Sequence, residues 1–73
     1  MVRDPRIDPR PGDWTVMRRK HHALTEDWFW LVLSRSTDGE QVTYMDNDGD
    51  IDTTDIDGWQ QGSKNDEVLY VAE

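Results

Sequence analysis

Six consecutive large apolar residues, Trp28 to Leu33, stand in a chain that is otherwise polar and acidic. The run is far shorter than the roughly 20 residues that span a bilayer. Its length and its aromatic and branched side chains favour a β-strand buried on both faces. We therefore predict a strand from Trp28 to about Arg35, and we expect the rest of the domain to pack around it.

The chain has 73 residues and no cysteine. This length suits one domain with a single core, and the absence of cysteine excludes disulfides and thiolate metal sites. The first residues are charged and no apolar stretch follows them, so we expect no signal peptide. These features predict a soluble cytoplasmic protein.

The net charge of −8 is unevenly distributed along the chain. Residues 1–22 carry six lysines and arginines against three aspartates, whereas residues 23–73 carry two basic against thirteen acidic residues. Such a surface repels nucleic acids and membranes and attracts basic partners. We therefore expect a protein partner, with no direct binding to nucleic acid or membrane.

The first twelve residues contain three prolines and two Asp-Pro-Arg repeats. Proline fixes φ and disfavours helix for the preceding residue, so we predict an extended arm over residues 1–12. The arm is either a loose tail or laid along the domain. A first strand is predicted over residues 14–19, with Trp14 and Val16 pointing inward.

Two Asp-Gly pairs, at 38–39 and 48–49, predict hairpin turns because this pair accepts positive φ. If the second pair is a two-residue loop, Met45 faces Asp52, and Ile51 lies on the core face with Val42 and Tyr44. Ile56 then needs a bulge near Thr53-Thr54 to point inward. A short turn over residues 58–62 would carry Trp59 into the core.

Strands are thus predicted near residues 14–19, 28–35, 41–46, from 51 onward and 67–71. Five short strands with regular turn signals predict an all-β fold, a small five-stranded SH3-like barrel over residues 13–73 with an extended N-terminal arm. Closure of the barrel would remove exposed strand edges.

The hexapeptide Asp8-Pro9-Arg10-Pro11-Gly12-Asp13 is followed by a strand, basic residues, a Val42-x-Tyr44 strand and Trp59. This arrangement resembles small uncharacterised proteins of bacteriophages and prophages with SH3-like barrels. The resemblance implies a phage-type origin and a small binding module acting in a bacterial host. It carries over no catalytic residues.

Residues 46–57 carry six aspartates and no basic residue. The six are Asp46, Asp48, Asp50, Asp52, Asp55 and Asp57. A rigid row of carboxylates along a strand can imitate a nucleic-acid backbone. We therefore predict that the chain binds a basic, nucleic-acid-binding host protein and inhibits it, as an anti-CRISPR, anti-restriction or transcription-factor inhibitor.

Calcium binding is an alternative role for the same residues. Asp46, Asp48, Asp50 and Asp52 are the candidate ligands. A calcium loop that begins at Asp46 would need glycine at its sixth position, where this chain has Ile51. The sequence therefore favours a solvated acidic hairpin over a metal site.

Trp28 and Trp30 are further candidates for partner binding, because a core this small cannot bury every aromatic ring. They lead to a second hypothesis, in which the chain is a structural or adaptor barrel that binds a protein partner through apolar contacts. The same contacts could instead join two copies of the chain in a homodimer. No catalytic residues and no cofactor are predicted. His21 and His22 lie side by side and point to opposite faces of an extended segment, so they are interpreted as solvated loop residues.

Overall fold

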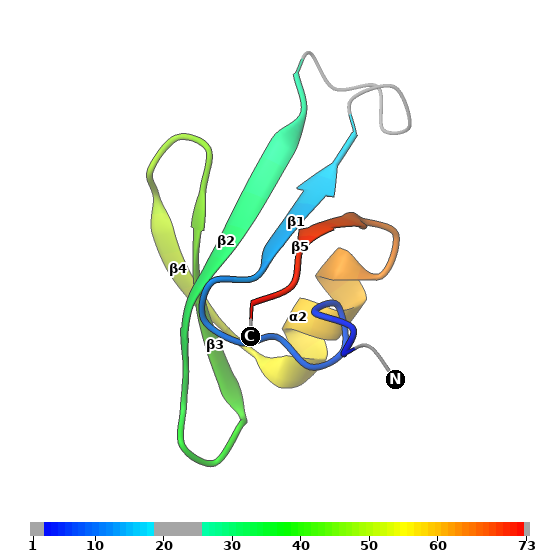
Figure 1. Cartoon of the computed structure of the whole chain (residues 1–73). Coiled ribbons are helices and arrows are strands. Elements are labelled where there is room, and N and C mark those ends of the chain that lie inside the picture. The colour runs from blue at the N-terminus through cyan, green and yellow to red at the C-terminus, as the bar shows by residue number, and fades with distance from the viewer. Residues whose placement is uncertain (1–2, 19–25, 73) are drawn as a thin grey trace.

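The structure is a computed structural model that describes residues 3–18 and 26–72. It contains strands β1 (Trp14–Met17), β2 (Trp28–Arg35), β3 (Gln41–Asp46), β4 (Ile51–Asp55) and β5 (Glu67–Tyr70), and helix α2 (Ile56–Ser63) between β4 and β5. The strands form one antiparallel sheet in the order β4-β3-β2-β1-β5 (Figure 1). The predicted all-β fold of five short strands is confirmed. The pairings run in one row, and among the described residues no ladder joins β4 to β5.

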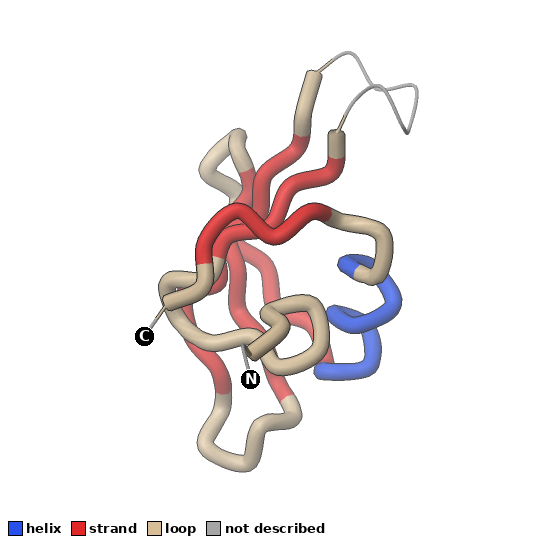
Figure 2. Tube along the Cα trace, turned by 45° about the vertical axis from the view of Figure 1, so that its right-hand side comes forward, coloured by secondary structure: helices blue, strands red, loops and turns tan. Residues whose placement is uncertain are grey.

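The apolar run forms the middle strand of this sheet, but the prediction that it is buried on both faces was wrong. Only Val32 of β2 is fully buried, and Leu33 is 37% exposed, because α2 covers one face of the sheet alone. Val32 of β2 is buried with Val42 of β3 and Trp59 of α2, and this group forms the core. Helix α2 lies on one side of the strands (Figure 2). The predicted turn at 58–62 is therefore part of a two-turn helix, and it does carry Trp59 into the core.

The β3–β4 hairpin has a different register from the predicted one. Both Asp-Gly glycines have positive φ, 79° at Gly39 and 85° at Gly49, as expected. However, the N–H of Gly49 donates to the carbonyl oxygen of Asp46, and the N–H of Asp46 donates to that of Asp50. The loop is therefore longer than two residues, and Met45 pairs with Ile51 instead of Asp52.

This shift of one residue exchanges the two faces of β4. Ile51, predicted in the core, is 63% exposed, whereas Asp52 pairs with Tyr44 and shares its face. Ile56 then points inward and packs against the core without a bulge in β4, since the β3–β4 register is continuous from Asp55 to Ile51. The predicted faces of Ile51 and Asp52 and the predicted bulge were therefore wrong.

Strand β1 is only partly as predicted. Val16 is fully buried, but it pairs with Phe29 and shares a face with Trp14, which is 38% exposed. Thr15, which pairs with the core residue Trp30, is the side chain of β1 on the core face, so the predicted faces of this strand were wrong. Trp14 pairs with Leu31 of β2 and with Tyr70 of β5, so these side chains share the face of the sheet that α2 does not cover.

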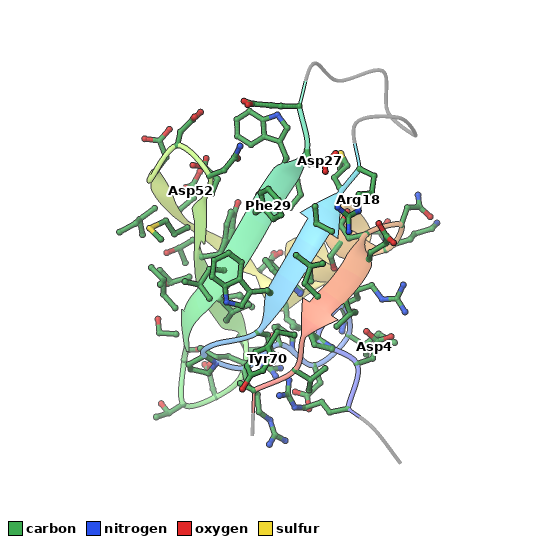
Figure 3. The ribbon with its side chains drawn as sticks, turned by 45° about the horizontal axis from the view of Figure 1, so that its top comes forward. Asp4, Arg18, Asp27, Phe29, Asp52 and Tyr70 are labelled. Carbon is green, nitrogen blue, oxygen red and sulfur yellow. The ribbon has the colours of Figure 1, made fainter. Side chains whose placement is uncertain are left out.

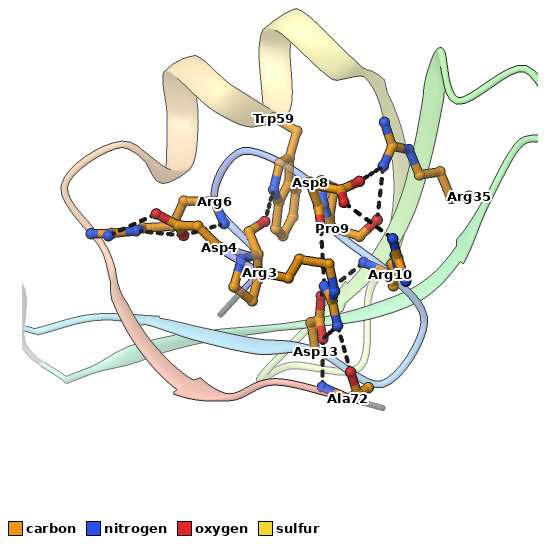
Figure 4. A network of polar contacts seen from close by, with 11 residues as sticks. Arg3, Asp4, Arg6, Asp8, Pro9, Arg10, Asp13, Arg35, Trp59 and Ala72 are labelled. Carbon is orange, nitrogen blue, oxygen red and sulfur yellow. Dashed lines mark hydrogen bonds and ion pairs between the residues drawn. The ribbon is translucent and has the colours of Figure 1, made fainter. Parts of the chain in front are cut away.

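The N-terminal arm is laid along the domain and contacts α2 (Figure 4). The indole N–H of Trp59 donates to the carbonyl oxygen of Pro5 at 2.9 Å, and the amide of Gln60 donates to that of Ile7 at 2.8 Å. The arm is not wholly extended, because the N–H groups of Ile7 and Asp8 both donate to the carbonyl oxygen of Asp4. The arm therefore covers one side of the helix.

The end of the arm is fixed by Asp13, whose side chain is fully buried. Its carboxylate pairs with the Arg3 guanidinium and accepts the N–H groups of Arg10 (2.8 Å) and Ala72 (2.7 Å). One carboxylate thus joins the arm, the start of β1 and the chain after β5. The predictions for His21 and His22, and the predicted end of the first strand at residue 19, lie outside the described residues.

Candidate functional site: an acidic segment and an aromatic hollow

The six predicted aspartates follow one another from the end of β3 to the first turn of α2. We call residues 46–57 the acidic segment. Five of its aspartates are exposed, and Asp46 is partly buried. Because β4 is an end strand of the sheet, the segment lies along one edge of the molecule.

Asp46 organises the loop at the tip of this segment. Its Oδ1 accepts the N–H groups of Asp48 (2.9 Å) and Asp50 (3.1 Å). One carboxylate oxygen from each of these three residues lies within 4.8 Å of the others. Calcium takes six to eight oxygen ligands, so three carboxylates would leave half or more of its coordination to water. Asp52, the fourth predicted ligand, is not in this group, because the register places it beside Tyr44.

Asp55 and Asp57 have a structural role as well as a charge. Asp55 is the N-cap of α2, and its Oδ1 accepts the N–H of Gly58 at 2.7 Å. Asp57 lies in the first turn, where a negative charge interacts favourably with the helix dipole. Substitutions at Asp55 would therefore change the stability of α2 as well as the charge of the acidic segment.

The arginines of the described residues all pair with acids outside the acidic segment. Arg3 pairs with Asp13, Arg6 with Asp4, Arg10 and Arg35 with Asp8, and Arg18 with Asp27 and Glu67. Residues 1–22 carry more basic than acidic residues, and the four arginines of this stretch that the structure describes are each paired with an acid. Within residues 3–18 and 26–72, no ion pair involves the acidic segment.

Trp28 and Trp30 do not form an exposed pair. Trp30 packs against the core, and Trp28 is partly buried at the start of β2, opposite Met17. The exposed apolar surface lies on the other face, where Tyr70 is 57% exposed. Figure 3 shows Phe29 and Tyr70 in front of the sheet on that face.

A groove of about 320 Å³ crosses this outer face. Its apolar walls are Trp14, Phe29, Leu31 and Met45. Sequence reasoning missed this groove, because it placed Trp14 in the core and looked for the exposed rings at Trp28 and Trp30.

On the inner side, a hollow of about 170 Å³ lies between α2 and the sheet. We call it the aromatic hollow, because Trp30, Tyr44 and Trp59 line it, together with Asp66. The ring centroids of Tyr44 and Trp59 are 5.5 Å apart, with the rings tilted by 54°. Burial raises the pKa of Tyr44, and the charges of Asp52 and Asp46 raise it further. The rings were visible in the sequence, but only the packing of α2 brings them together.

Comparisons of the chain with models of known protein families, with curated proteins and with solved structures gave no match. The resemblance to phage proteins therefore stays a prediction. Within the described residues, no helix is long and apolar enough to cross a membrane.

Proposed function

We propose that this chain is a non-enzymatic, phage-type protein-binding module whose acidic segment binds and inhibits a basic, nucleic-acid-binding protein of a bacterial host. One observation carries the proposal. Within the described residues, every arginine is paired with an acid elsewhere, and no ion pair involves the six carboxylates of the acidic segment.

The backbone of the segment supports this role because it holds the charges in place. β4 itself carries two carboxylates, Asp52 and Asp55, which lie three residues apart and so point to opposite faces of the strand. The loop before it is fixed by the hydrogen bonds to Asp46, and the helix start after it by those to Asp55. Fixed charges lose little freedom when a partner binds. A protein with a lysine- and arginine-lined nucleic-acid site would meet a preformed anionic surface.

The first experiment is capture of proteins from a bacterial lysate on the immobilised chain, at low and at moderate salt. The Debye length falls from about 30 Å at 0.01 M to about 10 Å at 0.1 M, so electrostatic binding should weaken strongly between these conditions. Each captured protein is then tested for binding to its nucleic acid with and without the chain. We expect the chain to displace the nucleic acid in a salt-dependent manner.

The matched variants are two double substitutions that remove the same charge. Asp48→Asn with Asp50→Asn changes exposed side chains at the tip of the segment and leaves the loop-forming Asp46 unchanged. Asp38→Asn with Glu40→Gln removes two exposed acids from the β2–β3 turn, where asparagine keeps the acceptor oxygen of Asp38. We expect about tenfold weaker binding for the first variant, about 0.7 kcal/mol per charge, and little change for the second. Equal losses in both variants would show that net charge, and not this segment, determines binding.

The outer groove supports a second candidate, an adaptor that binds its partner through apolar contacts. Exposed rings and aliphatic side chains on a sheet face are typical of protein interfaces. In that case binding would be nearly independent of salt and unaffected by the Asp48 and Asp50 substitutions. A Tyr70→Ser variant would weaken it.

A further inference from the structure

The face of the sheet that α2 does not cover carries a continuous row of apolar side chains. Each member of the row is paired directly with the next one on the neighbouring strand, and directly opposed residues share a face. From β5 to β4, the members are Tyr70, Trp14, Leu31, Met45 and Ile51. We call them the outer row. Neighbouring strands lie about 4.7–4.9 Å apart, so the row is roughly 19 Å long.

Strand β2 has more apolar side chains than one covered face requires. A strand with one face in water normally alternates apolar and polar residues. In β2, Trp30 and Val32 belong to the core, and the residues that alternate with them, Phe29 and Leu31, are apolar as well. Helix α2 covers only the side of Trp30 and Val32 (Figure 2). The composition of β2 is therefore that of a strand covered on both faces, and the described part of the chain supplies only one cover.

The outer row is open to a partner. Ile51 and Tyr70, at its two ends, are 63% and 57% exposed, and contiguous apolar residues on a surface mark interaction sites. The middle of the row lines the groove of about 320 Å³, together with Phe29. This volume is at the lower limit of the roughly 300–1,000 Å³ of pockets for drug-sized ligands. The groove therefore has room for one large side chain of a partner, but not for a folded element.

The charge beside the groove indicates which partner fits. The groove ends at the β3–β4 turn, where Asp46, Asn47 and Gly49 line it. The same turn carries Asp48 and Asp50, which are exposed and take part in no ion pair within the described residues. A partner with a side chain in the groove would place its neighbouring residues at this turn. Lysine or arginine is attracted there, and an acidic residue is repelled.

A second copy of the chain fits this face less well than a basic partner. Each copy has a net charge of −8, and each would bring its own acidic turn to the edge of the shared face. Like charges that meet across an interface weaken binding and slow association. A basic segment gains from the same electrostatic field.

We propose that the outer groove is an anchor site for a partner segment in which one large apolar side chain is flanked by lysines or arginines. The apolar side chain enters the groove between Trp14, Phe29 and Met45, and the basic residues contact the turn that carries Asp48 and Asp50. The inference rests on the proposed function for the basic character of the partner. It adds an apolar anchor, which distinguishes one basic protein from another where charge alone does not.

The test uses three acetylated and amidated pentapeptides, at a constant ionic strength of about 0.1 M, where the Debye length is about 10 Å. The first peptide is Lys-Lys-Phe-Lys-Lys, the second has alanine in place of phenylalanine, and the third has glutamates in place of the lysines. The readout is the movement of the indole N–H signals of Trp14 and Trp59 in NMR spectra. Trp14 is a wall of the groove, whereas Trp59 lies on the other face and donates to the Pro5 carbonyl oxygen.

We expect the first peptide to move the Trp14 signal saturably, with a dissociation constant on the order of 1 mM, and to leave the Trp59 signal in place. The alanine peptide should bind at least about tenfold more weakly, because it buries no ring in the groove. The glutamate peptide should also bind at least about tenfold more weakly, because the turn repels it.

Two substitutions of exposed or half-buried apolar residues by threonine provide matched variants, since threonine favours strands. Met45→Thr removes part of a groove wall and should weaken binding of the first peptide by at least about threefold. Leu69→Thr changes an exposed residue of β5 outside the outer row and should change binding by less than about twofold.

Four results overturn the inference. The absence of a saturable shift of the Trp14 signal at ten times the expected dissociation constant is one. Equal binding of the phenylalanine and alanine peptides is another, and it would leave the proposed function intact, because the acidic segment would then bind basic chains by charge alone. Equal binding of the glutamate peptide would show an apolar groove without preference for charge. A stable dimer in sedimentation that Tyr70→Ser dissociates would place a second copy on the outer row.

The proposed function fails by a different result. A captured nucleic-acid-binding protein whose binding is unaffected by the Asp48 and Asp50 substitutions would contradict it, whatever the peptides do in the groove.

Discussion

Replacing Asp13 with asparagine should remove a large part of the stability of this domain. The carboxylate is fully buried, and the Arg3 side chain that it pairs with is only 14% exposed. Four donors converge on it, two from Arg3 and the N–H groups of Arg10 and Ala72. Asparagine keeps one acceptor oxygen but places an NH₂ group against donors, and it leaves Arg3 without its counter-charge.

The expected cost follows from the burial of this pair. Breaking a buried ion pair by removing one partner costs about 3–5 kcal/mol. At about 0.05–0.15 kcal/mol per residue, the whole domain has roughly 4–11 kcal/mol of unfolding free energy. Each lost kcal/mol lowers the Tm of so small a domain by about 4–8 °C. We therefore expect the Tm of the Asp13→Asn variant to fall by at least about 12 °C.

Urea denaturation followed by tryptophan fluorescence, together with thermal melts, measures this loss. Asp48→Asn is the matched control, because Asp48 is exposed and its substitution should stay within about 0.5 kcal/mol. An Arg3→Gln variant and the double variant complete a cycle, in which a coupling of about 0.5–3 kcal/mol is expected for residues in contact. A loss below about 1 kcal/mol for Asp13→Asn would refute the assigned role of this carboxylate.

Three further predictions concern pH and the helix. Burial raises the pKa of Asp13, but the hydrogen bonds from Arg3, Ala72 and Arg10 outweigh this effect and leave the pKa below its ordinary value. The contribution of Asp13 to the free energy of unfolding is therefore fully present above the unfolded-state pKa of about 3.9, and it is lost as the pH falls through the lower pKa of the folded state. Acid titration of stability should show this loss below about pH 4 in the native chain, and a smaller loss in Asp13→Asn. Gly62→Ala should raise the free energy of unfolding by up to about 1 kcal/mol, because alanine favours the helix and its Cβ meets no atom. Gly58→Ala should raise the free energy of unfolding by less, or lower it, because its Cβ would clash with Thr54 Oγ1. Chemical denaturation of both variants measures this difference. Asp55→Ala should cost about 1 kcal/mol as the N-cap is lost, and Asp55→Ser should recover most of it in the same assay.

Local patterns in the sequence were sufficient to predict the strands. The apolar run at 28–33 is the middle strand β2, and the two Asp-Gly pairs mark the two hairpins, because both signals depend only on neighbouring residues. The register of the β3–β4 hairpin was not predictable in this way. Gly49 fits a two-residue loop and a longer one equally well, and the choice between them reverses every side chain of β4.

The candidate site was also only partly visible in the sequence. The six aspartates of the acidic segment are adjacent along the chain, so their clustering needed no tertiary information. That Asp52 lies beside Tyr44 depends on the hairpin register. That the arginines are used elsewhere depends on the folding of the arm against Asp13 and of Arg35 against Asp8, contacts between residues 10 and 27 positions apart.

The sequence by itself therefore determined the fold class, the position of the central strand and the sign of the charge on residues 46–57. These are local properties of composition and spacing. Only the tertiary structure decided which charges stay unpaired and which rings meet. Trp30, Tyr44 and Trp59 come from a strand, a neighbouring strand and a helix, and they line one hollow because α2 packs over the sheet while the arm holds Trp59 through Pro5. Contacts of this kind depend on the packing of distant segments, which no pattern within a short stretch of sequence specifies.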